Sequence, residues 1–455
     1  MGIFKNNISK LLISFIFLSQ ITFYGFSDEG GAIIPNVLSL KEAIDIAVLN
    51  NRSIQIQQEE IEFARGNVLY GRSLFLPQVN AAFGYTYNNS VLPLSSPSGQ
   101  TKDPHIFTGY QNDNLATLSV DESIYNGGAN IANLEGGKLQ LKAQQETLRA
   151  TRLEVEFETK RLFFGILLAY ETRRIAQELV NQAQAHCDDT KTKFNQGTAS
   201  KFDVLQAKVQ VSKLIPQLVN AENAIELIMA EFKKELVLDL KKSVRIEGKL
   251  DYLLVEIKED SFLQEAYSKN PGMILKLLGL SINKWAIEYA KSGWLPQVTA
   301  SGNYSYRSSD IGNMFNPKHD LWNVGVKASI ALFDGFAPKA KVDEARAKYA
   351  QADLQKLDLI DQIAVDIKNA CLDLKQAKAV IDSQKDVIEE AKEALRLSEV
   401  RYNNGVGIAL DIFDAQVSLA QIEQNLAQGI YDYIMAKAQL DRIMGKEFFR
   451  EGSWQ

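Results

Sequence analysis

A tip motif that occurs twice limits the folds that this chain can adopt. Its second copy is the stretch Arg401–Gln416 (RYNNGVGIALDIFDAQ), which ends one very long helical pattern and begins another. Gly405 and Gly407 supply the backbone freedom that a sharp helix stop needs. Asp411 is placed to cap the helix that follows. The stretch therefore predicts the tip of a helical hairpin.

The first copy of the motif is Lys193–Ala207 (KFNQGTASKFDVLQA), 208 residues earlier. In the alignment of the two copies, Gly197 matches Gly405 and Asp203 matches Asp411. An internal repeat of this size divides the 455 residues into two halves of one fold rather than into three separate domains. We predict a first structural repeat at 28–237, a mid-length band at 238–261, a second repeat at 262–445 and a C-terminal tail at 446–455.

A helical pattern of about 70 residues leads to each tip, at about 128–195 and 336–404. At about 1.5 Å per residue, each helix is about 100 Å long. Apolar residues recur in both helices at a seven-residue step, which is typical of coiled-coil-like packing. The columns are Thr159, Ile166, Arg173, Val180, Cys187 and Phe194 in the first copy and Ile367, Leu374, Ile381, Ile388, Leu395 and Tyr402 in the second.

The helices that return from the tips, at about 201–235 and 409–444, are only half as long as the helices that lead to them. Two shorter helical patterns lie at about 53–74 and 275–293. We expect each of them to stack end to end on a return helix and so to supply the missing half.

Each half of the chain also contains two stretches in which apolar and polar residues alternate, and this period of two predicts strands. In one of them Val79, Phe83 and Tyr87 share a face, with Asn80 and Thr86 on the other. The predicted strands are 79–91 and 114–126 in the first half and 297–308 and 321–333 in the second.

Matched residues mark the places where helix changes to strand and strand to helix. A Leu-Pro-Gln-Val sequence precedes the first strand of each half, and its proline, Pro77 or Pro296, stops the helix and favours extended chain. The second strand of each half ends in Asn-Gly or Asp-Gly, at Gly127 and Gly335. The order helix, strand pair, hairpin is thus expected twice.

The N-terminal segment predicts export. Residues 1–27 carry lysines, a short apolar run and then small residues, as a secretory signal peptide does. No later run of 18 apolar residues offers a spanning helix. Four strands of about 10 to 13 residues have the length that crosses an outer membrane, but they cannot close a barrel by themselves. Because an open sheet edge is not tolerated in lipid, several chains must share one barrel.

The composition excludes several other classes of function. The 50 basic and 56 acidic residues form no basic block, so we expect no nucleic-acid partner. Cys187 and Cys371 lie at different levels of the predicted hairpins, about 36 Å apart along the axis, and cannot form a disulfide. The three histidines show no metal-ligand spacing. No catalytic arrangement is recognisable, so we expect neither an enzyme nor a cofactor.

Taken together, the paired tips, the Leu-Pro-Gln-Val sequences, the glycine exits and the two-fold repeat resemble the TolC-type outer-membrane efflux protein family, over about residues 38–445. The resemblance implies an α+β membrane protein, with long helical hairpins forming a periplasmic α-barrel below a transmembrane β-barrel shared by three chains. It further implies a homotrimer in the outer membrane, in contact with lipid. Such proteins dock on a periplasmic adaptor protein and, through it, on an inner-membrane transporter for drug efflux or type I secretion.

The resemblance also assigns roles at the tips. Asp411 and Asp414 match the carboxylates that ring the narrow periplasmic entrance. Asp203 and Tyr402 match positions that hold neighbouring tip helices together in the closed state. Some members have an arginine lock where this chain has Gly407, so the lock is absent here or differently made. Helix capping alone is an alternative role for Asp203 and Asp411.

Three other interpretations remain open from the residues. A soluble α+β protein with a sheet packed on coiled coil would also show the alternation. A periplasmic adaptor would be exported and carry a long hairpin, but it should have short Gly-rich strands rather than two copies of strand pair plus hairpin. A structural coiled-coil protein without a pore would lack aromatic strand pairs bounded by proline and glycine. The transported substrate cannot be read from the sequence.

Overall fold

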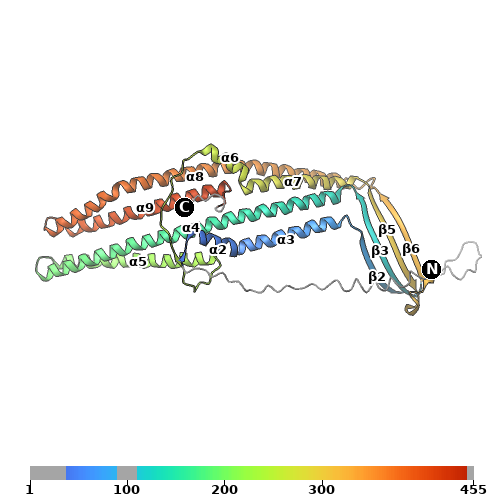
Figure 1. Cartoon of the computed structure of the whole chain (residues 1–455), viewed down its shortest axis with the longest axis horizontal. Helices are drawn as coiled ribbons and strands as arrows, with labels where there is room; N and C mark the ends of the chain where they lie inside the picture. Colours follow the sequence, from blue (N-terminus) through green and yellow to red (C-terminus); the bar gives the residue numbers. More distant parts are fainter. Residues whose placement is uncertain (1–36, 90–109, 448–455) are drawn as a thin grey trace, which may run out of the picture.

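A computed structural model of the chain describes residues 37–89 and 110–447. The molecule is elongated, with the strands at one end and the tips of two helical hairpins at the other (Figure 1). The predicted signal peptide, most of the loop after the first strand and nearly all of the C-terminal tail lie outside the described residues.

Four antiparallel strands form one sheet in the order β2-β3-β5-β6. The central pairing of β3 with β5 joins the two repeats. The strands are β2 (Gln78–Tyr87), β3 (Asn112–Asn126), β5 (Gln297–Ser308) and β6 (Asp320–Ser329).

Two of the predicted strands are too long. β2 ends at Tyr87 rather than at 91, where the chain is no longer described. β6 ends at Ser329 rather than at 333, because Ser329 pairs with Gln297, the first residue of β5. The residue before Gln297 is Pro296, which has no N–H for a further ladder bond. Beyond Ser329 the strand therefore has no partner to pair with.

The register places most apolar side chains on one face of the sheet and most polar side chains on the other, with Asn114 and Asp320 as polar residues on the apolar face. One row across all four strands runs Ala81, Leu118, Tyr304, Trp322. The adjacent row, on the other face, runs Asn80, Ser119, Asn303, Asn323. The apolar face is open to the surroundings, with Phe83 58% and Trp322 72% exposed. The alternation predicted from the sequence is thus present in the sheet.

The long helices have the expected lengths. α4 (Ala129–Asn195) and α8 (Ala337–Asn403) have 67 residues each, and the returning helices α5 (Lys201–Glu235) and α9 (Ala409–Ile443) have 35 each. Shorter helices occupy the strand-side half, namely α2 (Leu40–Asn50), α3 (Arg52–Ser73), α6 (Glu259–Lys269) and α7 (Pro271–Lys291). None of the described helices combines the length and apolar character needed to cross a membrane.

In each repeat an asparagine joins a short helix, α3 or α7, to the end of the return helix, α5 or α9. Asn51 caps α3 by accepting from the Ser53 N–H (2.8 Å), and its Nδ2 donates to the carbonyl oxygen of Glu235, the last residue of α5 (3.1 Å). In the second repeat, Asn270 accepts from the Met273 N–H (3.1 Å) and donates to the Ile443 carbonyl oxygen (2.9 Å). The predicted end-to-end stacking therefore has one polar junction in each repeat.

The heptad columns form the packing interface of the hairpins, except at Arg173 and Phe194 of the first copy, which are exposed. In α8, Ile367, Leu374 and Ile381 are fully buried. In α4, Arg173 is exposed and pairs with Glu222 of α5 (3.3 Å), so this position of the first column is not a core position. A long cationic side chain reaches the solvent at the edge of the interface instead of packing within it.

Both cysteines are free and buried, in separate hydrophobic clusters. Cys187 packs with Ala207 and Val211 of α5, as its place in the heptad column predicts. Cys371 packs with Leu374 and its neighbours, much closer to the middle of the molecule. The prediction that the two do not pair is consistent with these positions.

The segment between the repeats crosses the helices at mid-length (Figure 1). Its β4 (Arg245–Ile246) pairs in parallel with β1 (Val37–Leu38). Gly248 lies against Phe163 of α4, where an added Cβ would come within 3.2 Å of the ring. The Val255 N–H donates to the hydroxyl of Tyr433 in α9 (2.9 Å). The band thus ties the first hairpin to the second.

Candidate functional site

The two hairpin tips turn in the same way. At the first tip Gly197 has φ +80°, and its N–H donates to the Phe194 carbonyl oxygen (2.9 Å). At the second tip Gly405 has φ +74°, and its N–H donates to the Tyr402 carbonyl oxygen (3.0 Å). A left-handed residue just past the helix end is the usual way to close a helix, and glycine adopts it without strain.

Gly407 has a different part in the second tip from the one predicted. It is not among the residues with positive φ, so its place does not need a glycine's backbone freedom. Its N–H donates to the Arg401 carbonyl oxygen (3.1 Å), and an added Cβ would lie 3.1 Å from Arg401 Cβ and from the Tyr402 nitrogen. Gly407 is therefore needed for close approach of the turn to the end of α8.

Asp203 and Asp411 are third residues of their helices rather than the caps themselves. Ser200 caps α5: its Oγ accepts from the Asp203 N–H (3.1 Å), while Asp203 Oδ2 accepts from the Ser200 N–H (2.9 Å). At the matching place in α9 the cap is Ile408, whose side chain has no acceptor. Asp411 Oδ2 accepts from the Ile408 N–H at 3.5 Å. The second tip therefore has only one of the two reciprocal hydrogen bonds, the one that the Asp411 carboxylate accepts.

The first turns of α9 carry two carboxylates on either side of an apolar anchor. Asp411 is half-buried and Asp414 is exposed. Between them Ile412 and Phe413 are buried, at 4% and 5% exposed. The acidic groups are thus held at the extreme end of the molecule by side chains that point into it.

Those anchors contact the first hairpin through a histidine. The His186 ring of α4 lies 5.0 Å from the Phe413 ring in an edge-to-face arrangement and 5.1 Å from the Tyr402 ring of α8. Lys193 of α4 places its Nζ 4.4 Å from the centre of the Tyr402 ring and donates to Asn403 Oδ1 (3.2 Å). Tyr402 therefore links the two hairpins, whereas Asp203 is engaged in the cap of its own helix.

Sequence reasoning did not single out His186 or Phe413. In the alignment of the two tips, Phe413 matches Leu205, which is 52% exposed. The internal repeat therefore gave no sign that this position is buried. One indication that His186 lies near a packing interface was its neighbour in the sequence, Cys187, which belongs to the heptad column.

The four predicted junction residues lie where the sheet meets the helices. Pro77 directly precedes β2, and Pro296 directly precedes β5. Gly127 and Gly335 both have φ +67°. At Gly127 a Cβ would come within 2.6 Å of the Ser292 carbonyl oxygen, so this glycine also allows the two repeats to touch.

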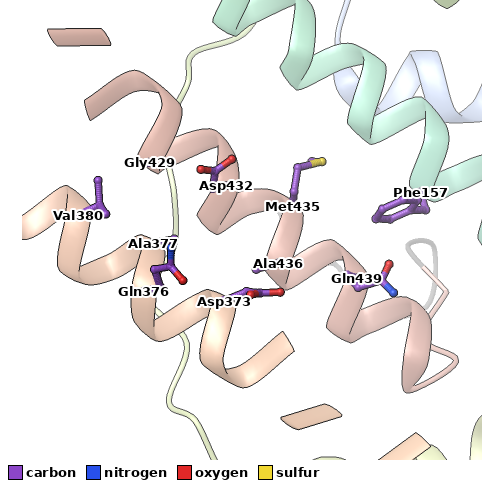
Figure 2. A pocket seen from close by; sticks show the side chains of 10 residues that line it. All are labelled: Phe157, Asp373, Gln376, Ala377, Val380, Gly429, Asp432, Met435, Ala436 and Gln439. Atoms are coloured by element: carbon purple, nitrogen blue, oxygen red, sulfur yellow. The ribbon is translucent and has the colours of Figure 1, made fainter. Parts of the chain in front are cut away.

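A groove of about 380 Å³ opens at mid-length, far from the tips. Figure 2 shows that Asp373 and Gln376 of α8 face Asp432 and Gln439 of α9 across it, with Phe157 of α4 at one side. Gly429 lets α8 and α9 approach closely here, since a Cβ would lie 3.1 Å from Val380. Within residues 37–89 and 110–447, no group of His, Cys, Asp and Glu has metal-binding geometry.

Comparison with known proteins agrees with this architecture. The model of the family described as "Outer membrane efflux protein" matches residues 43–231 and 264–446. Outer membrane protein TolC of Vibrio cholerae is 21% identical over 389 residues, covering 83% of this chain and 84% of TolC. The alkaline protease secretion protein AprF of Pseudomonas aeruginosa is 18% identical, covering 89% of this chain and 83% of AprF.

A solved structure of a membrane protein from Pseudomonas aeruginosa has the same fold. It superposes with a TM-score of 0.79 at 19% sequence identity and covers 90% of each chain. The family match spans most of both repeats, and the TolC protein of Vibrio cholerae is similar over most of its length. The chain therefore belongs to the outer membrane efflux protein family, and it is a TolC-type outer-membrane protein of the efflux-channel class.

Proposed function

We propose that three copies of this chain form a passive exit duct through the outer membrane. A periplasmic adaptor couples the duct to an inner-membrane transporter, and the hairpin tips gate it. The observation that carries the proposal is the open four-stranded sheet at one end of a long helical shaft.

The sheet has the surface of a barrel segment. Its apolar face exposes aromatic and branched side chains, while the opposite face carries Asn, Ser and Thr. Among the described strands, β2 and β6 each have one unpaired edge. Lipid tolerates neither an open edge nor unpaired backbone groups. Pairing of β6 with β2 of the next copy satisfies both edges, and four strands from each of three copies give a twelve-stranded barrel with a polar lumen.

The helices supply the periplasmic part of the duct. At about 1.5 Å per residue, α4 and α8 are about 100 Å long, so the tips lie deep in the periplasm when the sheet is in the outer membrane. Three copies place their hairpins side by side as an α-barrel. A tip at that depth can meet an adaptor protein and, through it, a transporter of the inner membrane.

The second tip supplies the gate. Three-fold symmetry would repeat Asp411 and Asp414 around the entrance and make a dense negative collar that favours cations. Tyr402 holds the second hairpin against the first, and Asp203 stabilises the neighbouring turn. Untwisting of α8 and α9 away from α4 then widens the entrance. No covalent chemistry is needed for conduction.

The family match argues against the periplasmic adaptor and the pore-free coiled coil. The exposed apolar face of the sheet argues against a soluble α+β protein, because a soluble protein would cover such a face. The cargo, whether small molecules or polypeptides, is set by the transporter rather than by this chain.

The proposal is tested by extracting the full chain from the outer-membrane fraction with detergent and measuring its native mass and its conductance in a planar bilayer. We expect a trimer with a small, cation-selective conductance. Replacing the collar by Asp411→Asn and Asp414→Asn removes the negative field and should raise the conductance or lower the cation selectivity.

The matched control is Asp432→Asn, the same change on the same helix but about 27 Å above Asp414 at the helical rise. It should leave conductance and selectivity as in the wild type. A monomer of the periplasmic fraction without conductance would refute the duct. A trimer whose selectivity is unchanged by the collar variant would refute the role of the two aspartates.

A further inference from the structure

The contact between the hairpins near the tips is centred on an imidazole. We propose that His186 positions the acidic entrance by holding Tyr402 and Phe413 of the second hairpin, and that protonation of His186 releases this latch. The inference rests on the proposed function, because it names the residue that regulates the same entrance.

The latch is defined here as His186, Tyr402, Phe413 and Lys193. His186 is 9% exposed although it lies on a helix near the end of an elongated molecule. Its ring contacts one aromatic residue on α8 and one on α9, at 5.1 and 5.0 Å. A single side chain of the first hairpin thus holds both helices of the second.

The latch is directly connected to the entrance carboxylates. Phe413 is the residue before Asp414 and two residues after Asp411, all within the first two turns of α9. Packing of Phe413 against His186 fixes the rotation of this helical segment, and so the direction in which both carboxylates point. Loss of the contact frees the start of α9 to turn or move away from α4.

The latch holds the second tip in place although the tip lacks the arginine lock. Gly407 stands at that position, and the turn has no room for a Cβ there without displacement of Arg401 or Tyr402. The link between hairpins comes instead from α4, through His186 and through Lys193, whose Nζ lies over the Tyr402 ring. The cross-link is therefore supplied by the first repeat.

The surroundings of His186 favour its neutral form. On its own helix it has Asp189 and Lys193, which pair with each other at 2.8 Å, and Thr190, whose Oγ1 lies 3.5 Å from Nε2. From α8, Glu399 and Tyr402 line the same groove of about 350 Å³. From α9, the groove residues Ile412 and Gln416 are uncharged.

On the other side of α4, Ala183 and Cys187 pack against Ala207 and Val211 of α5 in one apolar cluster. Burial is the main reason that the pKa of His186 is lowered, and Lys193 lowers it further, while Asp189 acts in the opposite direction. The aromatic rings could attract an imidazolium. However, the Lys193 ammonium already lies over the Tyr402 ring, and it repels a second cation at the same ring.

The direction of the pH effect follows from linkage. In the released state His186 is in water, with the ordinary pKa of 6.5. In the latched state its pKa is lower, so the released state binds more protons. The latch is therefore fully stable above about pH 6.5 and is lost as the pH falls from there through the lower, latched pKa. In this window each pH unit changes the ratio of latched to released tips by up to about tenfold.

The test compares the pH dependence of conductance for the full chain in a planar bilayer. Between about pH 7.5 and about pH 5.5, on either side of the ordinary histidine pKa, the wild type should increase its conductance or open time by at least about threefold. His186→Phe keeps a ring in the latch but cannot be protonated, so it should stay at the low, neutral-pH level throughout. His319→Phe, in the loop between β5 and β6, is the matched control and should keep the wild-type response.

A second measurement needs no conductance. Spin labels at Gln184→Cys on α4 and Asn404→Cys after α8 are both exposed and report the distance between the hairpins. This distance should lengthen at about pH 5.5 in the wild-type background and remain constant with His186→Phe.

The outcomes separate this inference from the proposed duct. A wild type that conducts but gives the same pH response as His186→Phe overturns the latch and leaves the duct intact. A wild type without conductance overturns the duct, and the label distances then decide the latch alone. A label distance that does not change with pH, or that changes equally with and without His186→Phe, contradicts the latch.

Discussion

Ser200 closes the first hairpin tip with a reciprocal pair of hydrogen bonds to Asp203, whereas Ile408, at the matching place of the second tip, has no side-chain acceptor to offer. Loss of a serine cap costs about 0.5–2 kcal/mol, so the start of α9 is held less firmly than the start of α5 by its local sequence. At the second tip, contacts with the first hairpin take the place of the cap. The weaker tip is also the one that carries Asp411 and Asp414.

Gly407 allows a residue-scale prediction. In Gly407→Ala the new Cβ would sit 3.1 Å from Arg401 Cβ and from the Tyr402 nitrogen, so the end of α8 must move. We expect a loss of about 1 kcal/mol in local stability, as for other overpacked sites. Hydrogen exchange of the Gly405 and Val406 amides, which donate to the last carbonyls of α8, should become several-fold faster.

The control for this prediction is Ala199, the residue of the first tip that aligns with Gly407. Ala199→Gly removes a Cβ that the first turn already accommodates. Exchange at the first tip should then change only slightly, through added backbone freedom. If Gly407→Ala leaves the exchange of the second tip unaltered, the close approach described here does not constrain the turn.

At the scale of elements, the asparagine junctions decide whether each short helix and the return helix below it behave as one column. Asn51 and Asn270 each provide an acceptor to the start of one helix and a donor to the end of another. Asn51 has an additional partner, Glu235 Oε1 at 2.8 Å, and is more buried than Asn270. The two asparagines, at equivalent positions of the repeat, therefore contribute unequally to stability.

We predict that Asn51→Ala destabilises the chain more than Asn270→Ala. Each substitution removes a helix cap, at about 1 kcal/mol, and leaves the last carbonyl of a return helix without its donor. At Asn51 the carboxylate of Glu235 also loses a donor, and burial already raises the pKa of this group. Thermal melting of helix content in detergent should show a lower midpoint for both variants, with the larger decrease for Asn51→Ala.

Asn270→Asp separates the two roles of the junction. Aspartate caps a helix as well as asparagine does, but its carboxylate cannot donate to the Ile443 carbonyl. The melting midpoint should fall between those of the wild type and Asn270→Ala. A midpoint equal to the wild type would mean that the donor to Ile443 contributes nothing.

At the scale of the whole molecule, a buried charge group joins the two repeats at mid-length. Glu156 and Lys160 of α4 are 4% and 5% exposed, and Lys437 and Asp441 of α9 face them. Burial lowers the pKa of Lys160, while Asp441 and Glu156 support its charged form. Nearer the tips, Arg174 of α4 pairs with Glu423 of α9 (2.9 Å). In the proposed opening of the tips, this buried group is a candidate for the pivot.

Asp441→Asn is therefore expected to weaken the connection between the repeats. Removing one partner of a fully buried pair costs about 3–5 kcal/mol, and the cost here should be smaller because Asp441 itself is half-buried and Glu156 remains. The melting midpoint in detergent should fall clearly below that of Asp432→Asn, an exposed carboxylate on the same helix (Figure 2). Equal midpoints would show that the group does not hold the repeats together.

The sequence by itself determined the parts that depend on local and periodic patterns. Each of these patterns is visible within a short stretch of sequence: the tip glycines, the alternation in the strands, the proline and glycine junctions and the seven-residue step. Both hairpins and all four strands could therefore be located from the residues alone. The errors in β6 and at Arg173 arose where a strand's end depends on its partner, or where a long side chain leaves the interface.

Tertiary structure alone decided which groups meet across the two repeats. His186 and Phe413 lie more than 200 residues apart, and so do Lys160 and Asp441. Their contact depends on how one hairpin lies against the other, which no local pattern encodes. The need for Gly407 likewise comes from the approach of a turn to a helix end rather than from its own φ. The sequence therefore located the two hairpin tips, but only the packing of the two hairpins showed which residues join them.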